Sequence, residues 1–407
     1  MITETKVIQT PGRITQFFLD ARPDNWRLLL SASASAYGTG LLAMLVLPFM
    51  IGATMSGLGL DEEQAGFLGT VEFLGVMVAS LLVAPFIGRL PRRNLALAGV
   101  ALAIAGNALS VTQSSYDVLL LIRAAVGFGC GLALAAGNAT VANAENPEKL
   151  AAQMSMLFVA LMVVAMVGFA RVSGLWGYHG VYGALAVCML LNAVLIFWLP
   201  QGAGRVHSTV EHPHTHRKIL SLSGILMLLV MFAFALRDTM MWAFAERIGS
   251  GVGYSAEDLG MLFSAQAVIG IIGPLVASLV GSRYGLRLPV LVGIVLTGIV
   301  TFTILQSSKA IVPYTAGVLF ISGTYFYALA YLTALAAELD TQGRIVAASG
   351  GFLVAGVAVG PAVSGMLIVR GGYDLSSWVN VGIVVTTLLL ALVPLRAIER
   401  KAEALPH

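Results

Sequence analysis

Charged side chains are scarce in this chain of 407 residues, where Asp, Glu, Lys and Arg make up 11%. A soluble domain carries about a quarter. Hydrophobic residues make up 58% of the chain, and the mean hydropathy is +0.89. A water-soluble fold would have to expose this apolar surface, so the composition excludes one. The lack of long polar stretches also excludes a disordered chain.

Cysteine and the motifs of common catalytic sites are equally scarce. Cys130 and Cys188 both lie in apolar runs, which excludes a disulfide scaffold and a cysteine-rich metal site. The chain contains no glycine-rich phosphate loop ending in Gly-Lys, no His-Glu zinc signature and no Gly-x-Ser-x-Gly elbow. We therefore expect a protein that is not an enzyme and holds no cofactor or metal. The net charge of +3 is too small to indicate a nucleic-acid partner.

What the chain has instead is a series of apolar runs, each about long enough to cross a bilayer. Residues 1–25 lack the apolar core of a secretory signal, so we expect the first run to be a retained helix. In water so many apolar helices would have no polar face to expose, whereas in lipid each satisfies its own backbone. The twelve expected spans are 28–56, 65–88, 94–112, 117–142, 150–172, 180–199, 219–245, 257–281, 287–306, 312–337, 345–369 and 376–395.

Lys and Arg are distributed unequally between the two sides of these spans. One set of loops holds most of them, and the other holds only Arg171, Arg247, Lys309 and Arg370. The positive-inside rule places the basic side and both chain ends in the cytoplasm, which requires an even number of spans. The compact loops favour an inner (plasma) membrane.

A polar break divides the spans into two sets of six. Its histidines are interpreted as part of a solvated linker rather than a metal site, because only Glu211 accompanies His207, His212, His214 and His216. The expected organisation is a cytoplasmic N-terminal segment at 1–27, six-helix bundles at 28–200 and 219–396, a cytoplasmic linker at 201–218 and a cytoplasmic tail at 397–407.

The two sets of spans resemble each other. One constant offset pairs Gly57 with Gly251, Gly66 with Gly260, Glu63 with Glu257, Arg89 with Arg283 and Arg93 with Arg287. Identities between apolar helices are inflated by composition, but matched glycines and arginines are less easily explained that way. A repeated six-helix unit implies two pseudo-symmetric bundles with a site between them.

These two halves, the linker and the basic loops at 84–93 and 278–287 together resemble the major facilitator superfamily over nearly the whole chain. The loops keep the family's basic residues, here Arg89, Arg92, Arg93, Arg283 and Arg287. Gly88 and Ser282 stand where the family has an acid, so its charge latch is absent or uses another acid. The resemblance implies a twelve-helix transporter that works by alternating access as a monomer, with these arginines in gating loops.

Two further motifs bear on this resemblance. Arg123, followed by Gly127, Gly129 and Gly131, matches the fourth-helix motif, and Gly127 and Gly131 predict a bare strip for close helix contact. The glycine-rich antiporter signature of the fifth helix is missing. A similar string at 350–365 lies in the eleventh span, where packing and a kink are the simpler interpretation.

Four charged residues lie inside apolar runs, which is costly unless each finds a partner or a wet cavity. Glu72, Arg123, Arg237 and Asp238 are expected in one layer, roughly 9 Å below one membrane face at 1.5 Å per residue. They form either a structural ion-pair network or a functional site. In the functional reading Glu72, the better candidate, and Asp238 couple transport to protons, while Arg123 and Arg237 bind an anionic substrate group.

Polar and aromatic residues on spans one, four, seven and ten complete the predicted site, because these helices line the path in the resembled fold. The expected substrate-binding residues are Tyr37, Asn138, Trp242, Tyr327 and Tyr331. Such a pocket suits a partly apolar organic solute. For the tyrosines, an interfacial aromatic belt is the alternative.

Three functions follow, in order of preference. The first is a secondary transporter for a small organic anion, coupled to protons. The second is a proton-driven efflux antiporter for amphipathic or cationic compounds. The third is a receptor or other membrane protein that binds ligands without moving them. The expected partners are the small-molecule substrate, protons and the lipid bilayer.

Overall fold

The computed structural model describes residues 23–202, 221–281, 283–307, 310–340 and 343–403, and every regular element in these ranges is helical. The predicted all-α class is thereby confirmed. The linker histidines, Ser282 and Lys309 lie outside the described residues, as do residues 1–22 and 404–407.

Nine helical segments of the described chain are long and apolar enough to cross a membrane. They are α5 (Glu62–Val83) with the turn η2 (Ala84–Phe86), α6 (Arg92–Thr112), α7 (Tyr116–Ala142), α8 (Pro147–Ile196), α9 (Leu222–Trp242) with α10 (Ala245–Gly251), α11 (Ala256–Ile269) with α12 (Ile272–Val280), α13 (Arg287–Gln306), α14 (Ile311–Leu339) and α15 (Arg344–Glu403).

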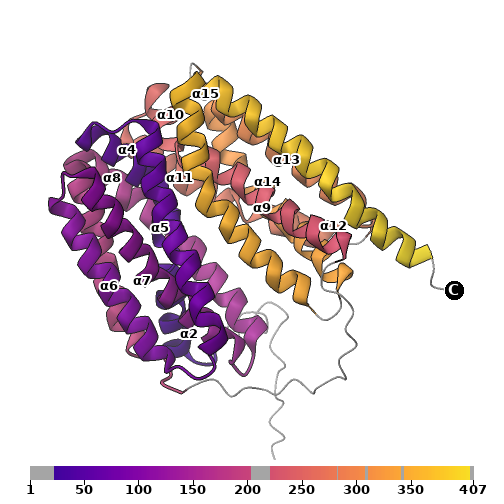
Figure 1. The fold of residues 1–407 in the computed structure, drawn as a ribbon, viewed down its shortest axis with the longest axis horizontal. Helices are drawn as coiled ribbons and strands as arrows, with labels where there is room; N and C mark the ends of the chain where they lie inside the picture. Colours follow the sequence, from indigo (N-terminus) through magenta and orange to yellow (C-terminus); the bar gives the residue numbers. More distant parts are fainter. Residues whose placement is uncertain (1–22, 203–220, 282, 308–309, 341–342, 404–407) are drawn as a thin grey trace, which may run out of the picture.

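Two of these segments, α8 and α15, each comprise two of the expected spans. Gly177 in α8 has φ 56° and ψ −142°, and Gly372 in α15 has φ 68° and ψ −173°. Only glycine adopts such angles without steric strain, so the chain turns back there without a polar loop. Figure 1 shows the two arms of α15 meeting at this bend. The sequence pattern predicted separate helices because it cannot show that the helices meet end to end.

The first expected span, 28–56, is not one continuous helix. It is divided into α2 (Trp26–Ser33), a π-helical turn η1 (Ala34–Thr39), α3 (Leu42–Leu45) and α4 (Leu47–Leu58). Pro48 contributes to the break, because it has no N–H to bond the carbonyl of Met44 four residues earlier. The wide turn η1 is tied to α8, where Asn192 Nδ2 donates to the Gly38 carbonyl at 2.7 Å.

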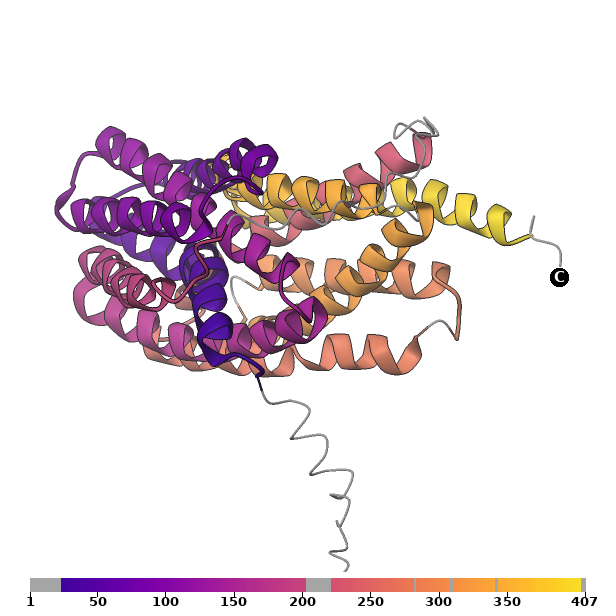
Figure 2. The ribbon, with the colours of Figure 1, turned by 90° about the horizontal axis from the view of Figure 1, so that it is seen from below.

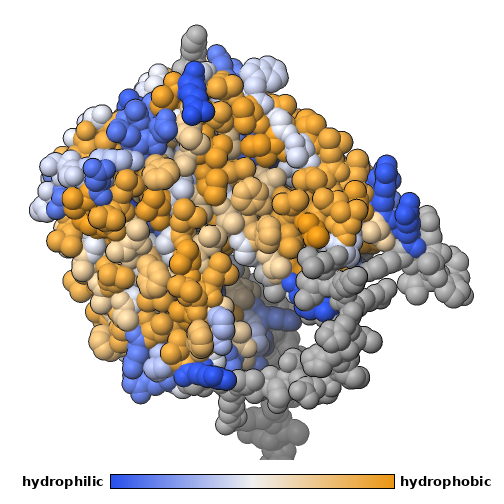
Figure 3. Space-filling view, in the orientation of Figure 1, coloured by the Kyte–Doolittle hydropathy of each residue, from blue (hydrophilic) through white to orange (hydrophobic). Residues whose placement is uncertain are grey.

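The helices form two groups. Those of residues 26–196 lie on one side of the molecule and those of residues 222–403 on the other (Figures 1 and 2). The groups meet where α5 packs on α15 and where α8 packs on α11. Large apolar side chains such as Leu121 and Val312 are exposed, and the surface is predominantly hydrophobic (Figure 3). This surface matches lipid rather than water.

Glycines set the closest helix contacts within the first group. A Cβ at Gly127 of α7 would overlap the Glu72 carbonyl of α5, and one at Gly131 would overlap the Val76 carbonyl. The bare strip predicted on α7 therefore lies directly against the α5 backbone. The same contact holds Glu72 in position.

Replacing Gly127 with Ala should destabilise the protein by about 1–3 kcal/mol, because α5 and α7 would have to separate. Gly168→Ala is the matched control, since a Cβ at that position in α8 meets nothing within 4 Å. Thermal unfolding in detergent measures both variants. Equal melting temperatures for the two would contradict the close packing described here.

Candidate functional site

A cavity of about 390 Å³ lies between the two groups of helices. The first group contributes Met44, Phe73, Asn138 and Phe158, among others, and the second contributes residues of α9, α11, α14 and α15. The surface is recessed between the groups at the end where α2 begins and α7 ends (Figure 3). We call this the linker end and the opposite one the far end.

Asp238 is the one residue with a charged side chain among the described residues that line the cavity. Its Oδ1 atom is buried and accepts no hydrogen bond from the described residues. α9 carries it, next to Trp242 one turn later, which also lines the cavity. An acidic group in an otherwise largely apolar wall is the main electrostatic feature of this site.

Gln266 of α11 and Tyr325 of α14 also line the cavity, and neither is among the expected substrate-binding residues. Gln266 Nε2 donates to Ser322 Oγ, while the Oε1 atom is buried without a hydrogen-bond donor among the described residues. The Tyr325 ring stacks on Phe234 with the ring centres 5.0 Å apart. The internal repeat could have identified Gln266, because the constant offset that pairs Gly66 with Gly260 also pairs Gln266 with the candidate residue Glu72.

Hydrogen bonds between the groups close the cavity toward the far end. Trp242 Nε1 donates to the Met44 carbonyl at 3.2 Å, the carbonyl that Pro48 leaves without a helical partner. The Ala362 N–H donates to Thr70 Oγ1 at 3.0 Å, and Ser264 Oγ donates to the Val163 carbonyl at 2.9 Å. Thr70 and Ser264 are related by the repeat offset, so the closure is itself pseudo-symmetric.

Glu72 and Arg123 pair with each other inside the first group and do not line the cavity. Arg123 Nη1 lies 3.6 Å from Glu72 Oε2, and both side chains are fully buried. Arg123 also donates to Asn107 at 3.0 Å and to Ser110 at 2.7 Å, and its guanidinium lies over the Tyr182 ring. Here the structure shows the ion-pair arrangement that was one of the two expectations.

Arg237 lies in the second group and is also outside the cavity lining. Its guanidinium carbon is 4.8 Å from the centre of the Phe234 ring, and its three nitrogens donate to no described residue. The four charged residues therefore do not share one cavity: Asp238 lines it, Arg237 is buried next to it in α9, and the Glu72–Arg123 pair lies elsewhere.

Of the other expected substrate-binding residues, some line the cavity and some do not. Trp242 and Asn138 line the cavity, and Tyr37 packs behind the lining residue Phe158 at 4.9 Å. Tyr327 and Tyr331 instead contact each other, and the Tyr331 hydroxyl donates to the carbonyls of Ala277 and Gly281 beside α12. Successive helix residues are about 100° apart, so the face of α14 that carries Tyr325 lies toward the cavity and these two lie away.

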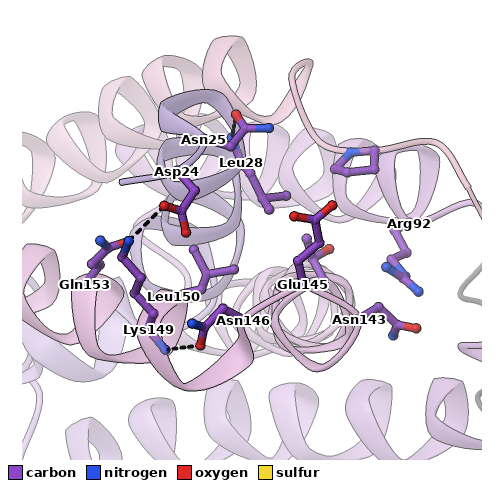
Figure 4. A pocket seen from close by; sticks show the side chains of 13 residues that line it. Asp24, Asn25, Leu28, Arg92, Asn143, Glu145, Asn146, Lys149, Leu150 and Gln153 are labelled. Atoms are coloured by element: carbon purple, nitrogen blue, oxygen red, sulfur yellow. Dashed lines mark hydrogen bonds and ion pairs between the residues drawn. The ribbon is translucent and has the colours of Figure 1, made fainter. Parts of the chain in front are cut away.

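The predicted gating arginines lie at the linker end. Arg93 Nε donates to the Leu199 carbonyl at 2.7 Å, Arg287 pairs with Glu399 at 3.4 Å, and Arg89 and Arg283 are exposed. Arg92 is buried and lines a second hollow of about 380 Å³ in the first group. Figure 4 shows this hollow between the start of α2 and the α7–α8 turn, spanned by the ion pair of Lys149 and Asp24.

The pattern of the Major Facilitator Superfamily matches residues 28–236 and 226–405. The purine ribonucleoside efflux pump NepI of Shigella sonnei is 23% identical over 233 residues, which cover 56% of this chain and 58% of that protein. The 4-hydroxybenzoate transporter PcaK of Pseudomonas putida is 28% identical over 198 residues, covering 46% and 43%. The matching stretch thus spans about half the length of these relatives.

The crystal structure of a D-xylose–proton symporter superimposes with a TM-score of 0.68 at 15% sequence identity. The match covers 94% of this chain and 97% of that one. At this identity the likeness establishes the fold.

Glu72→Gln should lower the stability by about 3 kcal/mol, because it leaves Arg123 as a buried charge without its counter-ion. Glu257→Gln is the matched control, since Glu257 is exposed in the first turn of α11. Unfolding in detergent, followed by circular dichroism, measures the difference between them. If both variants melt with the wild type, the pair is not a structural element of the first group.

Proposed function

The chain belongs to the Major Facilitator Superfamily, and we propose that it moves a small, partly apolar organic solute across the membrane by alternating access. It is a multi-pass membrane protein of a transporter family. The observation that carries the proposal is the cavity between the two groups of helices, with Asp238 in its wall. A solute held there contacts both groups, so their relative movement would carry it from one side to the other.

The contacts around the cavity support an inward-facing arrangement. The hydrogen bonds of Thr70, Ser264 and Trp242 join the groups on the far side, and the surface is recessed on the linker side. With the basic loops in the cytoplasm, the recess would face the cytoplasm of a cell whose inner membrane holds the protein. Access from the other side requires these far-end bonds to break.

Proton coupling is the second part of the proposal, and Asp238 is the group we assign to it. A carboxylate in an apolar wall is stabilised when a proton or a cationic solute neutralises it. A proton and a solute that both neutralise Asp238 would compete for it, which produces exchange. Glu72 remains the second candidate, although Arg123 already neutralises it.

The charge of the lining favours exchange of protons for an amphipathic or cationic compound over symport of an organic anion. The described lining residues include an acid and no Lys, Arg or His, and the candidate anion ligands Arg123 and Arg237 lie outside the lining. The relatives include a purine ribonucleoside efflux pump and a 4-hydroxybenzoate transporter, so they do not point to a single substrate class. The sign of the cavity charge supports the exchange of protons for a cationic compound here.

Asp238→Asn should reduce solute accumulation driven by a pH gradient at least about tenfold in proteoliposomes, because Asn binds no proton at neutral pH. Asp374→Asn, at an exposed position, is the control. Glu72→Gln, measured in parallel, assigns the coupling to Glu72 instead if it alone abolishes driven accumulation. Driven accumulation that survives in both variants would exclude proton coupling through either acid.

Removing both far-end hydroxyl contacts, with Thr70→Val and Ser264→Ala, should shift the protein toward an outward-open state. Each hydrogen bond contributes about 0.5–1.5 kcal/mol, so the population ratio should change about fivefold or more. Spin labels at the exposed positions Ser114 and Glu257, one in each group, report the far-end separation by pulsed electron resonance. Thr303→Val, outside this interface, is the control. An unchanged distance distribution would show that these bonds do not hold the far end closed.

A further inference from the structure

Some buried polar atoms of the cavity wall have hydrogen-bond partners and others have none, and this difference indicates which polar groups the solute must carry. Two buried N–H groups of the lining already have acceptors, since Trp242 Nε1–H bonds the Met44 carbonyl and one N–H of Gln266 Nε2 bonds Ser322 Oγ. Two buried acceptors have no donor among the described residues, namely Asp238 Oδ1 and Gln266 Oε1. A buried acceptor without a donor is unfavourable, so a ligand that supplies donors gains most from this site.

We infer that Asp238 and Gln266 together form a recognition site for two hydrogen-bond donors, and that the solute is a ring-bearing organic amine, bound as a cation, with a second N–H or O–H group. The inference rests on the proposed transport function and specifies its substrate class. Gln266 acts in it as a residue that determines specificity.

The electrostatics of the lining favour a cation at Asp238. The carboxylate lines the cavity, whereas Arg237, beside it in the sequence, is held over the Phe234 ring and lies outside the lining. An ammonium group bonded to Asp238 would neutralise the one charge of the described lining and use its free oxygen. An anion would meet the same carboxylate without a basic side chain in the lining to offset it.

The rest of the wall suits an aromatic body. Phe73 and Phe158 come from the first group, and Tyr325 and Phe326 come from α14. Aromatic faces attract both apolar rings and cations, and a desolvated site strengthens the attraction to a cation. The ring of the solute would therefore lie among these side chains while its donors reach Asp238 and Gln266.

The repeat explains why Gln266 is neutral and open. At the corresponding position in the first half, Glu72 is matched by Arg123, and that pair lies outside the cavity lining. In the second half the position holds an amide with no arginine partner, and it lines the cavity. The same repeat position thus holds Glu72, in a buried ion pair, in the first half and Gln266, a hydrogen-bond acceptor in the cavity wall, in the second half.

Binding of three probes to the full-length protein in nanodiscs tests the inference. Tyramine is an aromatic cation with a second donor, tetraphenylphosphonium is a cation without donors, and 4-hydroxybenzoate is an anion. Calorimetry at one fixed pH measures each dissociation constant for the wild type, Gln266→Met and Gln266→Glu. Gln306→Met is the matched control, because Gln306 also donates to a serine, Ser377, but lies outside the cavity lining.

We expect wild-type protein to bind tyramine more tightly than 4-hydroxybenzoate. Gln266→Met should weaken tyramine binding about tenfold, as the loss of one hydrogen bond to a buried acceptor predicts, and change tetraphenylphosphonium binding less than about twofold. Gln266→Glu keeps an oxygen acceptor at this position, so tyramine binding should be retained. Its added negative charge should further weaken the binding of 4-hydroxybenzoate. If Gln266→Met does not fold, this second variant decides the question.

The inference is overturned if tyramine does not bind, if 4-hydroxybenzoate binds more tightly, or if neither Gln266 variant discriminates between the probes as described. Flux into proteoliposomes separates this outcome from failure of the proposed function. Driven flux of 4-hydroxybenzoate without tyramine binding keeps the transporter and rejects the donor site. Tyramine binding that depends on Gln266, without flux of any probe, supports the site and rejects transport.

Discussion

A polar group inside a bilayer has no water to bond, so it must find its partner within the protein or in a wet cavity. This constraint accounts for most of what distinguishes the chain. Every regular element of the described residues is helical, glycines bring helices into backbone contact, and Arg123 is enclosed by Glu72, Asn107 and Ser110. Among the polar atoms left without a hydrogen bond to the described residues, those of Asp238 and Gln266 lie where the two groups of helices leave a cavity.

The two halves use the same repeat for different purposes. Thr70 and Ser264 occupy equivalent positions and both bond across to the other half, so they close the far end symmetrically. Glu72 and Gln266 are also equivalent, yet one forms an internal ion pair and the other lines the cavity. The symmetric positions therefore serve the closure, and the asymmetric pair places a neutral amide, Gln266, in the cavity wall.

The break in the first expected span also contributes to the contact between the two halves. Pro48 frees the Met44 carbonyl, and the Trp242 indole takes it from the opposite half. Because Trp242 also lines the cavity, the bond joins the wall of the site to its closure. A solute that displaces the Trp242 ring would weaken a contact between the halves, which links binding physically to movement.

Composition and the spacing of apolar runs were enough to determine the membrane class and the all-α fold, because lipid imposes one pattern on every crossing helix. The repeated halves and their basic loops indicated the family. The sequence also marked Asp238, Asn138 and Trp242, which line the cavity. It could not decide that Glu72 and Arg123 lie elsewhere, that Tyr325 rather than Tyr327 lines the cavity, or that Gln266 belongs to it. Those outcomes depend on the rotation of each helix about its axis, which is set by packing between helices distant in sequence rather than by any local pattern.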